Sequence, residues 1–140
     1  MPTMRVDLYS MVNGYGFCRP VGEGVIRDRV YFRVEDFVRL HPGEPLPIAG
    51  ELVEVPDVVP GGRSPRAASV QRKQSPTRLQ GTVKSFDPVK GWGFIERGAD
   101  LYFLHRSDLV EPFTPIIGSV LDFYVGEKKG RPRACYVSRV

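Results

Sequence analysis

Two short segments of the sequence place aromatic side chains two positions apart. Trp92 and Phe94 form the first pair, and Phe103 and His105 form the second. Residues two apart in a β-strand share one face of the sheet, so each pair would present its rings on the same side. An exposed ring can stack on the π-face of any unpaired nucleic-acid base, at about 1–3 kcal/mol per base. These residue types at this spacing therefore predict a base-stacking surface.

The alternative is that these rings belong to a hydrophobic core, as most aromatic residues in strands do. The opposite faces of the same two segments are also apolar, because they carry Ile95, Tyr102 and Leu104. A small barrel has only one inside, so one of the two faces must remain in contact with water. We therefore expect Ile95 and Leu104 in the core and the aromatic pairs outside, with Lys84 and Lys90 beside them to bind phosphate.

The elements that would carry these pairs are short strands. Gly (15) and Pro (13) are frequent and interrupt helices, and no segment longer than about ten residues keeps a helical period. In the second half we predict strands at 82–86, 91–96, 101–104, 120–125 and 134–140. The first half predicts strands at 4–9, 15–19, 29–34, 50–58 and 66–70. Five strands in about 60 residues must curl into a barrel to bury their apolar face, so the fold class is all-β.

Three segments recur in the same order in the two halves of the chain. The first-half segments are Gly14-Tyr15-Gly16-Phe17, Val30-Tyr31-Phe32-Arg33 and Pro65-Arg66-Ala67. Their second-half counterparts are Gly91-Trp92-Gly93-Phe94, Tyr102-Phe103-Leu104-His105 and Pro132-Arg133-Ala134. The spacing differs only by small loop changes, which predicts two tandem copies of one domain.

Charge is divided unevenly along the chain. The whole sequence has a net charge of +4, yet residues 1–70 hold eight Lys and Arg against nine Asp and Glu. Residues 71–80 add three cations and no acid, and residues 81–140 hold nine cations against seven acids. The positive part of the chain, which would attract a polyanion, is therefore the joining segment and the second copy.

The second copy resembles the cold-shock domain. Lys90-Gly91-Trp92-Gly93-Phe94-Ile95 and Tyr102-Phe103-Leu104-His105 are similar to that family's K-G-[FY]-G-F-I and V-F-V-H motifs. Gly81-Thr82-Val83-Lys84-Ser85-Phe86 resembles its first strand, and Lys129-Gly130-Arg131-Pro132-Arg133-Ala134 resembles the start of its last strand. The resemblance covers residues 81–140. It implies an OB-type five-stranded barrel that binds single-stranded RNA or DNA by base stacking.

The resemblance also implies which residues bind. Carried over position by position, these are Lys84, Phe86, Lys90, Trp92, Phe94, Phe103 and His105, with Phe113 as a loop aromatic. Two positions depart from the family pattern, because Ser85 replaces an exposed Trp and Arg106 replaces a Phe. Arg106 can still stack through its guanidinium plane, so we expect binding that is weaker than that of a typical member.

The first copy departs further from the family pattern. Asn13 stands in place of the Lys, Leu8 in place of the exposed Trp and Arg33 in place of the His. A reduced stacking surface would consist of Tyr15, Phe17, Tyr31 and Arg33. Two interpretations stay open for this copy: it contacts nucleic acid, or it is a structural or protein-docking copy.

Together these features predict two tandem five-stranded OB-type (cold-shock-like) β-barrels. Residues 1–70 form a degenerate cold-shock-like domain, 71–79 a basic linker and 80–140 a cold-shock domain. We expect a single-stranded nucleic-acid binding protein, with RNA favoured over DNA, of the RNA-chaperone or transcription-antitermination type. Arg106 and the linker cations Arg72, Lys73 and Arg78 would assist in holding the phosphate backbone. The alternative is an adaptor that docks a protein such as RNA polymerase or a ribosomal component.

Other classes of function find little support in the sequence. Its two His and two Cys form no metal-binding spacing, so we expect no metal, no cofactor and no enzymatic activity. Cys18 and Cys135 are expected as small core residues in a reducing compartment. No apolar run is long enough to span a membrane, and residues 1–5 contain no apolar signal core. These observations predict a soluble, cytoplasmic, monomeric protein without a membrane partner.

Overall fold

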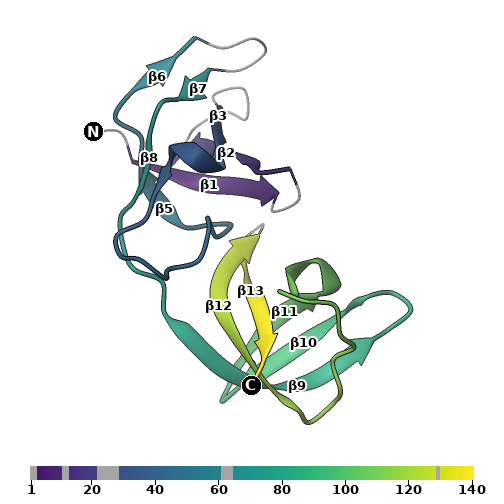
Figure 1. Cartoon of the computed structure of the whole chain (residues 1–140). Coiled ribbons are helices and arrows are strands. Elements are labelled where there is room, and N and C mark those ends of the chain that lie inside the picture. The colour runs from purple at the N-terminus through teal and green to yellow at the C-terminus, as the bar shows by residue number, and fades with distance from the viewer. Residues whose placement is uncertain (1–2, 11–12, 22–28, 61–64, 129) are drawn as a thin grey trace. The chain divides into compact units, whose positions relative to one another are not determined.

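The computed structural model describes residues 3–10, 13–21, 29–60, 65–128 and 130–140 of the chain. Lys129, which belongs to the last predicted turn, lies outside these residues. The chain divides into two compact units, Met1–Ser75 and Pro76–Val140. Within the described ranges the regular elements are strands and two single-turn 3-10 helices, η2 (Val34–Asp36) and η3 (Arg106–Asp108) (Figure 1).

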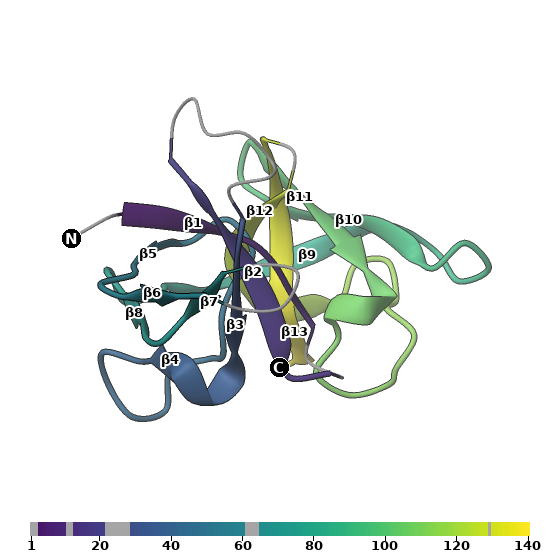
Figure 2. The same ribbon diagram turned by 90° about the horizontal axis from the view of Figure 1, so that it is seen from above.

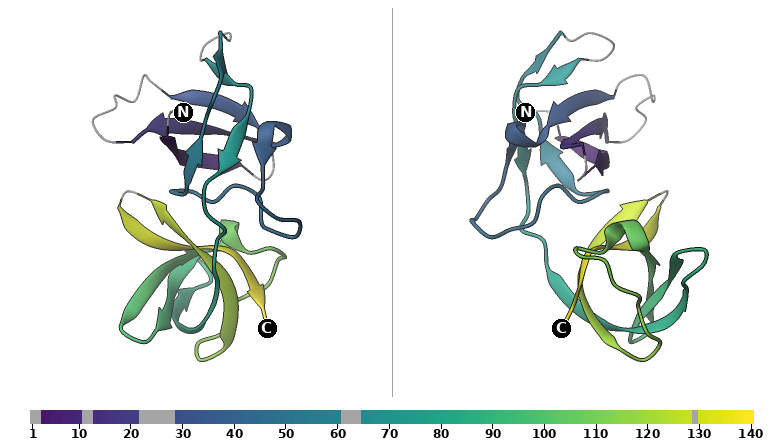
Figure 3. Two further views of the ribbon diagram at one scale, coloured as in Figure 1. Left: turned by 90° about the vertical axis from the view of Figure 1, so that its left-hand side faces the viewer. Right: turned by 45° about the vertical axis from the view of Figure 1, so that its right-hand side comes forward.

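The second unit is a closed barrel of five strands. They are β9 (Arg78–Asp87), β10 (Trp92–Arg97), β11 (Asp100–His105), β12 (Val120–Lys128) and β13 (Arg131–Arg139). The order around the barrel is β10-β11-β13-β12-β9, and Figure 3 shows these strands, teal to yellow, curling round one another. Only β11 and β13 pair in parallel, while the other neighbours are antiparallel. All five strands predicted for this half are present, and the barrel is OB-like.

The core of the barrel consists of the residues that alternate inward along these strands. It contains Val83, Ile95, Tyr102, Leu104, Leu121, Phe123, Ala134 and Val137. Ile95 and Leu104 are fully buried, as their positions opposite the aromatic pairs predict. The inward face of β10 and β11 is therefore the dry one, which leaves the faces with Trp92, Phe94, Phe103 and His105 on the outside.

A β-bulge and a glycine set how β9 lies on β10. Ile95 pairs with Val83 and Phe94 pairs with Ser85, so Lys84 is the extra residue. The bulge reverses the alternation of β9, which leaves Ser85 exposed. A Cβ added at Gly93 would collide with the Ser85 carbonyl oxygen, so only glycine allows the two strands this close.

The first unit is a curled sheet of eight short strands. They are β1 (Thr3–Ser10), β2 (Tyr15–Pro20), β3 (Val30–Arg33), β4 (Phe37–Val38), β5 (Leu52–Glu54), β6 (Val58–Val59), β7 (Arg66–Ala67) and β8 (Val70–Arg72). Their order is β4-β8-β5-β1-β2-β3-β7-β6 (Figures 1 and 2). Its described core contains Met4, Val6, Cys18, Val30, Phe32, Val53, Val55, Ala67 and Val70.

The five continuous strands predicted for the first half are therefore wrong in detail. The predicted strand 50–58 is interrupted between β5 and β6, where Pro56 has no backbone N–H to donate to a sheet. The predicted strand 66–70 is divided into β7 and β8 at residues 68–69, and the Ala68 N–H donates to the Asp57 carbonyl at 3.1 Å next to the β6–β7 pair. The unit is therefore a curled sheet in which β7 pairs with β3 and β8 pairs with β5.

Several local features of the two units nevertheless correspond. The β1–β2 pair also has an irregularity between Val6 and Leu8, and a Cβ at Gly16 would collide with the Leu8 carbonyl. β3 pairs in parallel with β7 through Tyr31 and Arg66, as β11 pairs in parallel with β13 through Phe103 and Arg133. These positions are related by the same offsets as the repeated sequence segments. Both cysteines, Cys18 and Cys135, are buried, and burial raises the pKa of the Cys18 thiol to about 12.

Arg72 is not a linker cation, which corrects the prediction made for it. β8 includes Arg72, and the first compact unit continues to Ser75, so the predicted linker 71–79 is shorter than expected. The Arg72 side chain is fully buried and contacts both carboxylate oxygens of Glu51 at 2.8 Å. It also donates to the carbonyl oxygens of Pro45 at 2.9 Å and Leu46 at 3.1 Å. The side chain therefore ties the Pro-rich loop to the sheet.

We predict that Arg72→Ala destabilises the first unit. The substitution leaves Glu51 without its buried partner, and breaking a buried ion pair costs about 3–5 kcal/mol. Thermal and urea unfolding followed by circular dichroism measure the loss. A variant that keeps full stability would contradict the buried ion pair and restore the linker interpretation.

Candidate nucleic-acid interface

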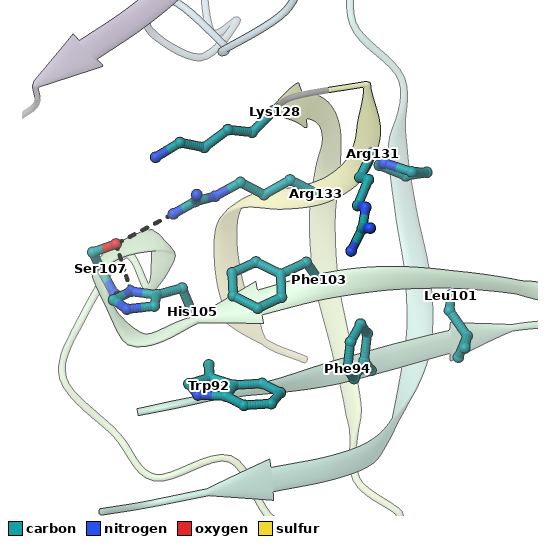
Figure 4. Close-up of a pocket in the computed structure, with 10 residues that line it drawn as sticks. Trp92, Phe94, Leu101, Phe103, His105, Ser107, Lys128, Arg131 and Arg133 are labelled. Atoms are coloured by element: carbon teal, nitrogen blue, oxygen red, sulfur yellow. Dashed lines mark hydrogen bonds between the residues drawn. The ribbon is translucent and has the colours of Figure 1, made fainter. Parts of the chain in front are cut away.

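Four rings gather on the outer face of β10 and β11, and we call Trp92, Phe94, Phe103 and His105 the aromatic face. Trp92 lies directly opposite His105 across the strand pair, and Phe94 lies opposite Phe103. The Phe103 centroid lies 6.0 Å from that of Trp92, 5.9 Å from Phe94 and 6.2 Å from His105. Trp92 is 40% exposed, and the other three are half-buried. Figure 4 shows the four rings side by side along the two strands.

A groove runs beside the aromatic face toward the β12–β13 hairpin. Besides the four rings, it is lined by Leu101, Ser107, Lys128, Arg131, Pro132 and Arg133 (Figure 4). No acidic side chain is among these described lining residues. The cations of the groove were not among the predicted binding residues. Two of these cations belong to Arg131-Pro132-Arg133, a segment whose resemblance to the family pattern indicated only the start of the last strand.

Arg133 is the most constrained of these cations. Its Nε lies 2.7 Å from an Asp108 carboxylate oxygen, and the side chain is 14% exposed. Its guanidinium lies 5.6 Å from the Phe103 ring centroid, within the range of a cation–π contact. Burial raises the pKa of Asp108, whereas the neighbouring Arg133 charge opposes that rise. The ion pair thus holds a guanidinium at the edge of the aromatic face.

His105 is held with its proton on Nε2. The Ser107 N–H donates to Nδ1 at 3.1 Å, and the Ser107 hydroxyl also contacts Nδ1 at 2.8 Å (Figure 4). A nitrogen that accepts a backbone N–H cannot carry a proton itself, so Nε2 is the donor of the ring. Burial, and then the charge of Arg133, lowers the pKa of His105. These effects disfavour the protonated imidazole, and the Ser107 contacts orient the ring.

The three cations predicted to accompany the rings lie outside the groove lining. Lys84 is exposed at the bulge and contacts Glu96 at 3.4 Å, and Lys90 is exposed in the turn before β10. Arg106 is exposed in η3 and packs against Gly91, where an added Cβ would meet its Cδ at 2.8 Å. These three charges flank the aromatic face on the β9 side and near the end of β11.

Two of the predicted aromatic contacts are not on the aromatic face. Phe86 is half-buried and packs against the barrel core, because the bulge at Lys84 turns it inward. Phe113 also packs against that core, and the Arg139 guanidinium covers its ring at 5.1 Å. Neither ring is among the described residues that line the groove.

The other two predicted linker cations, Lys73 and Arg78, also contact residues of the two units. Lys73 lies 3.6 Å from Glu54 and is partly exposed. Arg78 contacts Asp122 at 3.0 Å and donates to the Ser138 hydroxyl at 2.6 Å. Neither residue lines the groove.

The first unit carries a comparable cluster of rings, but its cations are paired. The Tyr31 ring centroid lies 5.6 Å from that of Tyr15 and 5.8 Å from that of Phe17. The predicted residue Arg33 is paired with Glu35 at 3.8 Å. Two further cations nearby are also paired, Arg29 with Asp7 at 3.3 Å and Arg66 with Asp36 at 3.1 Å. Arg29 also lies over the Phe17 ring at 4.3 Å. This face is therefore partly covered and close to neutral.

Metal-binding groups and membrane-spanning helices are both absent from the described residues. No group of three His, Cys, Asp or Glu side chains there is arranged to hold a metal ion. No helix among those residues is both long and apolar enough to cross a membrane.

Comparison with known proteins finds distant similarity to solved structures. No family model matches the sequence, and no curated protein matches it. The solved structure of "drosophila Unr CSD456" is similar to this chain with a TM-score of 0.37 and 19% sequence identity. The similarity covers 99% of this chain and 62% of the other, so this chain spans less than two thirds of that structure's length.

The first test of this geometry is the titration of His105. We predict that its imidazole pKa lies below the ordinary value of 6.5 and rises in Arg133→Gln, which removes a neighbouring positive charge. As the pH falls below 6.5, the unfolded chain takes up this proton before the folded chain does, so the free energy of unfolding decreases. NMR titration measures the pKa, and His105→Gln identifies the signal by removing it. A raised pKa in the unmodified protein would contradict the Ser107 and Arg133 contacts.

Proposed function

We propose that the second unit binds single-stranded nucleic acid by stacking unpaired bases on the aromatic face. The observation that carries this proposal is the set of four adjacent rings on an outer strand face, beside a groove with three cations and no acidic lining. A hydrophobic core explains none of these rings, because the core of the barrel is filled from the opposite face of the same strands. The proposal also draws on the sequence resemblance to the cold-shock domain.

The charges of the groove suit a phosphate backbone. Lys128 and Arg131 form no ion pair with another described residue, so their charges are available to phosphates. Lys84, Lys90 and Arg106 supply further cations around the rings. A base can reach the rings only when it is unpaired, so binding captures open strands and disfavours duplex. This is the behaviour of an RNA chaperone or a transcription antiterminator, with RNA favoured over DNA as the cellular ligand.

We further propose that the first unit is a second, modified copy of the same domain. The matched bulges, the Gly16 and Gly93 close approaches and the two parallel strand pairs support this proposal. Its paired cations make it the weaker polyanion site, even though Tyr15, Phe17 and Tyr31 still form a ring cluster. This same pairing favours the second candidate function, in which the first unit docks a protein and the chain acts as an adaptor.

The stacking mechanism can be tested with the fluorescence of the single tryptophan. We predict that Trp92 emission is quenched to saturation by short unstructured RNA or DNA. Phe103→Ala should weaken the affinity by about tenfold to a hundredfold, since one stacked base is lost. Phe113→Ala is the matched control: it should lower the stability of the barrel, because Phe113 packs on the core, and leave affinity unchanged.

An absence of quenching in a folded protein with exposed Trp92 would contradict the stacking proposal and favour the adaptor. Equal losses of affinity in Phe103→Ala and Phe113→Ala would also contradict it, because they would show that the effect follows stability rather than the aromatic face.

A salt titration tests the proposed phosphate contacts independently. The logarithm of the association constant should fall linearly with the logarithm of salt concentration. Arg131→Ala should reduce the steepness by about 0.7, the value for one phosphate contact on a single strand. Arg97→Ala is the control, because its guanidinium is engaged with the Gln80 carbonyl outside the groove. A slope near zero, or the same slope in both variants, would contradict phosphate binding in the groove.

A further inference from the structure

The groove beside the aromatic face is rich in hydrogen-bond donors and poor in acceptors. Among its described lining residues only Ser107 carries a side-chain oxygen, and that oxygen already contacts His105 Nδ1 and Arg133. The other polar side chains present N–H groups: Trp92, His105, Lys128, Arg131 and Arg133. A base that enters this groove therefore meets donors along its edge.

Arg133 is placed to contact a base rather than to follow the phosphate backbone. Asp108 holds it at 2.7 Å, its side chain is 14% exposed, and its guanidinium lies beside the Phe103 ring. A base stacked on Phe103 would bring its edge toward this guanidinium. Lys128 and Arg131, which no ion pair with a described residue restrains, are better suited to the mobile phosphates.

His105 adds a second fixed donor next to the same ring. Its centroid lies 6.2 Å from that of Phe103, and Ser107 fixes the tautomer so that Nε2 carries the proton. The base on Phe103 is thus bordered by the Arg133 guanidinium and the His105 ring. Both can donate a hydrogen bond to it, and neither can accept one from it.

Nucleic-acid bases differ in what they offer to such a site. Uracil, thymine and guanine carry a carbonyl oxygen at the position where cytosine and adenine carry an exocyclic amine. A carbonyl oxygen can accept from the Arg133 or His105 donors. An amine in the same place meets no side-chain acceptor among the described lining residues other than the Ser107 oxygen, which already has two partners, so it is disfavoured.

The geometry points to selection by the second unit of bases that carry a carbonyl oxygen at this position, with Arg133 as the residue that reads it. The inference rests on the proposed function, because it concerns a base stacked on the aromatic face. It predicts that uracil is preferred to cytosine, although both are pyrimidines. It predicts equally that hypoxanthine is preferred to adenine, although both are purines.

The experiment compares four RNA homopolymers of about eight nucleotides, made of uridine, cytidine, inosine or adenosine, by quenching of Trp92 in the full chain. Each pair with the same ring system holds stacking area nearly constant and changes the hydrogen-bonding groups. We expect uridine to bind about tenfold more tightly than cytidine, and inosine about tenfold more tightly than adenosine.

The matched variants assign the preference to Arg133. Asp108→Asn combined with Arg133→Gln replaces the ion pair with amides that both donate and accept, without leaving a buried carboxylate unpaired. Both affinity ratios should approach one in this double variant. Lys90→Ala removes an exposed cation outside the groove, so it should weaken all four oligonucleotides equally and leave the ratios unchanged.

The outcomes separate this inference from the proposed function. Equal binding of all four oligonucleotides by the unmodified protein, or ratios that persist in the double variant, would overturn the role of Arg133 and leave stacking intact. Failure of all four to bind would overturn the proposed function itself. Circular dichroism and Trp92 emission of the unbound variants establish that they are folded.

Discussion

The parallel pairing of Phe103 with Arg133 is the contact on which the second unit depends. It joins β11 to β13, the one parallel pair in the barrel, and so closes a sheet whose other neighbours are antiparallel. Closure gives β10 and β11 a single dry face and forces their other face outward. The same pairing places a guanidinium beside a ring, where Asp108 holds it. The strand pairing that closes the barrel therefore also positions Arg133 at the aromatic face.

The first unit has the corresponding strand pairing and ion pair, but the charge of the surface around its rings is different. Tyr31 pairs with Arg66, and Arg66 contacts Asp36, as Phe103 pairs with Arg133 and Arg133 contacts Asp108. The surrounding cations of the first unit are also paired with acids. Its ring cluster therefore lies in a nearly neutral surface, whereas Lys128 and Arg131 at the groove of the second unit form no ion pair with another described residue. A polyanion would distinguish the two surfaces by charge, although their rings are similar.

The placements that the sequence did not predict have physical causes in the fold. One extra residue at Lys84 shifts the two-residue period of β9, so Phe86 packs against the core instead of joining the aromatic face. Phe113 lies in a loop whose path no periodicity predicts, and the Arg139 guanidinium lies over its ring. Arg72 was expected in a solvated linker, but its partner Glu51 lies 21 residues earlier in the chain. Each of these placements depends on a contact between residues that are not neighbours in the sequence.

Alternation along the chain alone determined that the second unit is built of strands, that Ile95 and Leu104 are buried, and that two aromatic pairs share the opposite face. These properties depend on residues one or two positions apart, where strand geometry is fixed. Tertiary structure decided which cations join the rings and how the short strands of the first unit pair. Those properties depend on strands that meet only after folding. The cations of the groove arrive on the β12–β13 hairpin, which closure of the barrel brings beside β11.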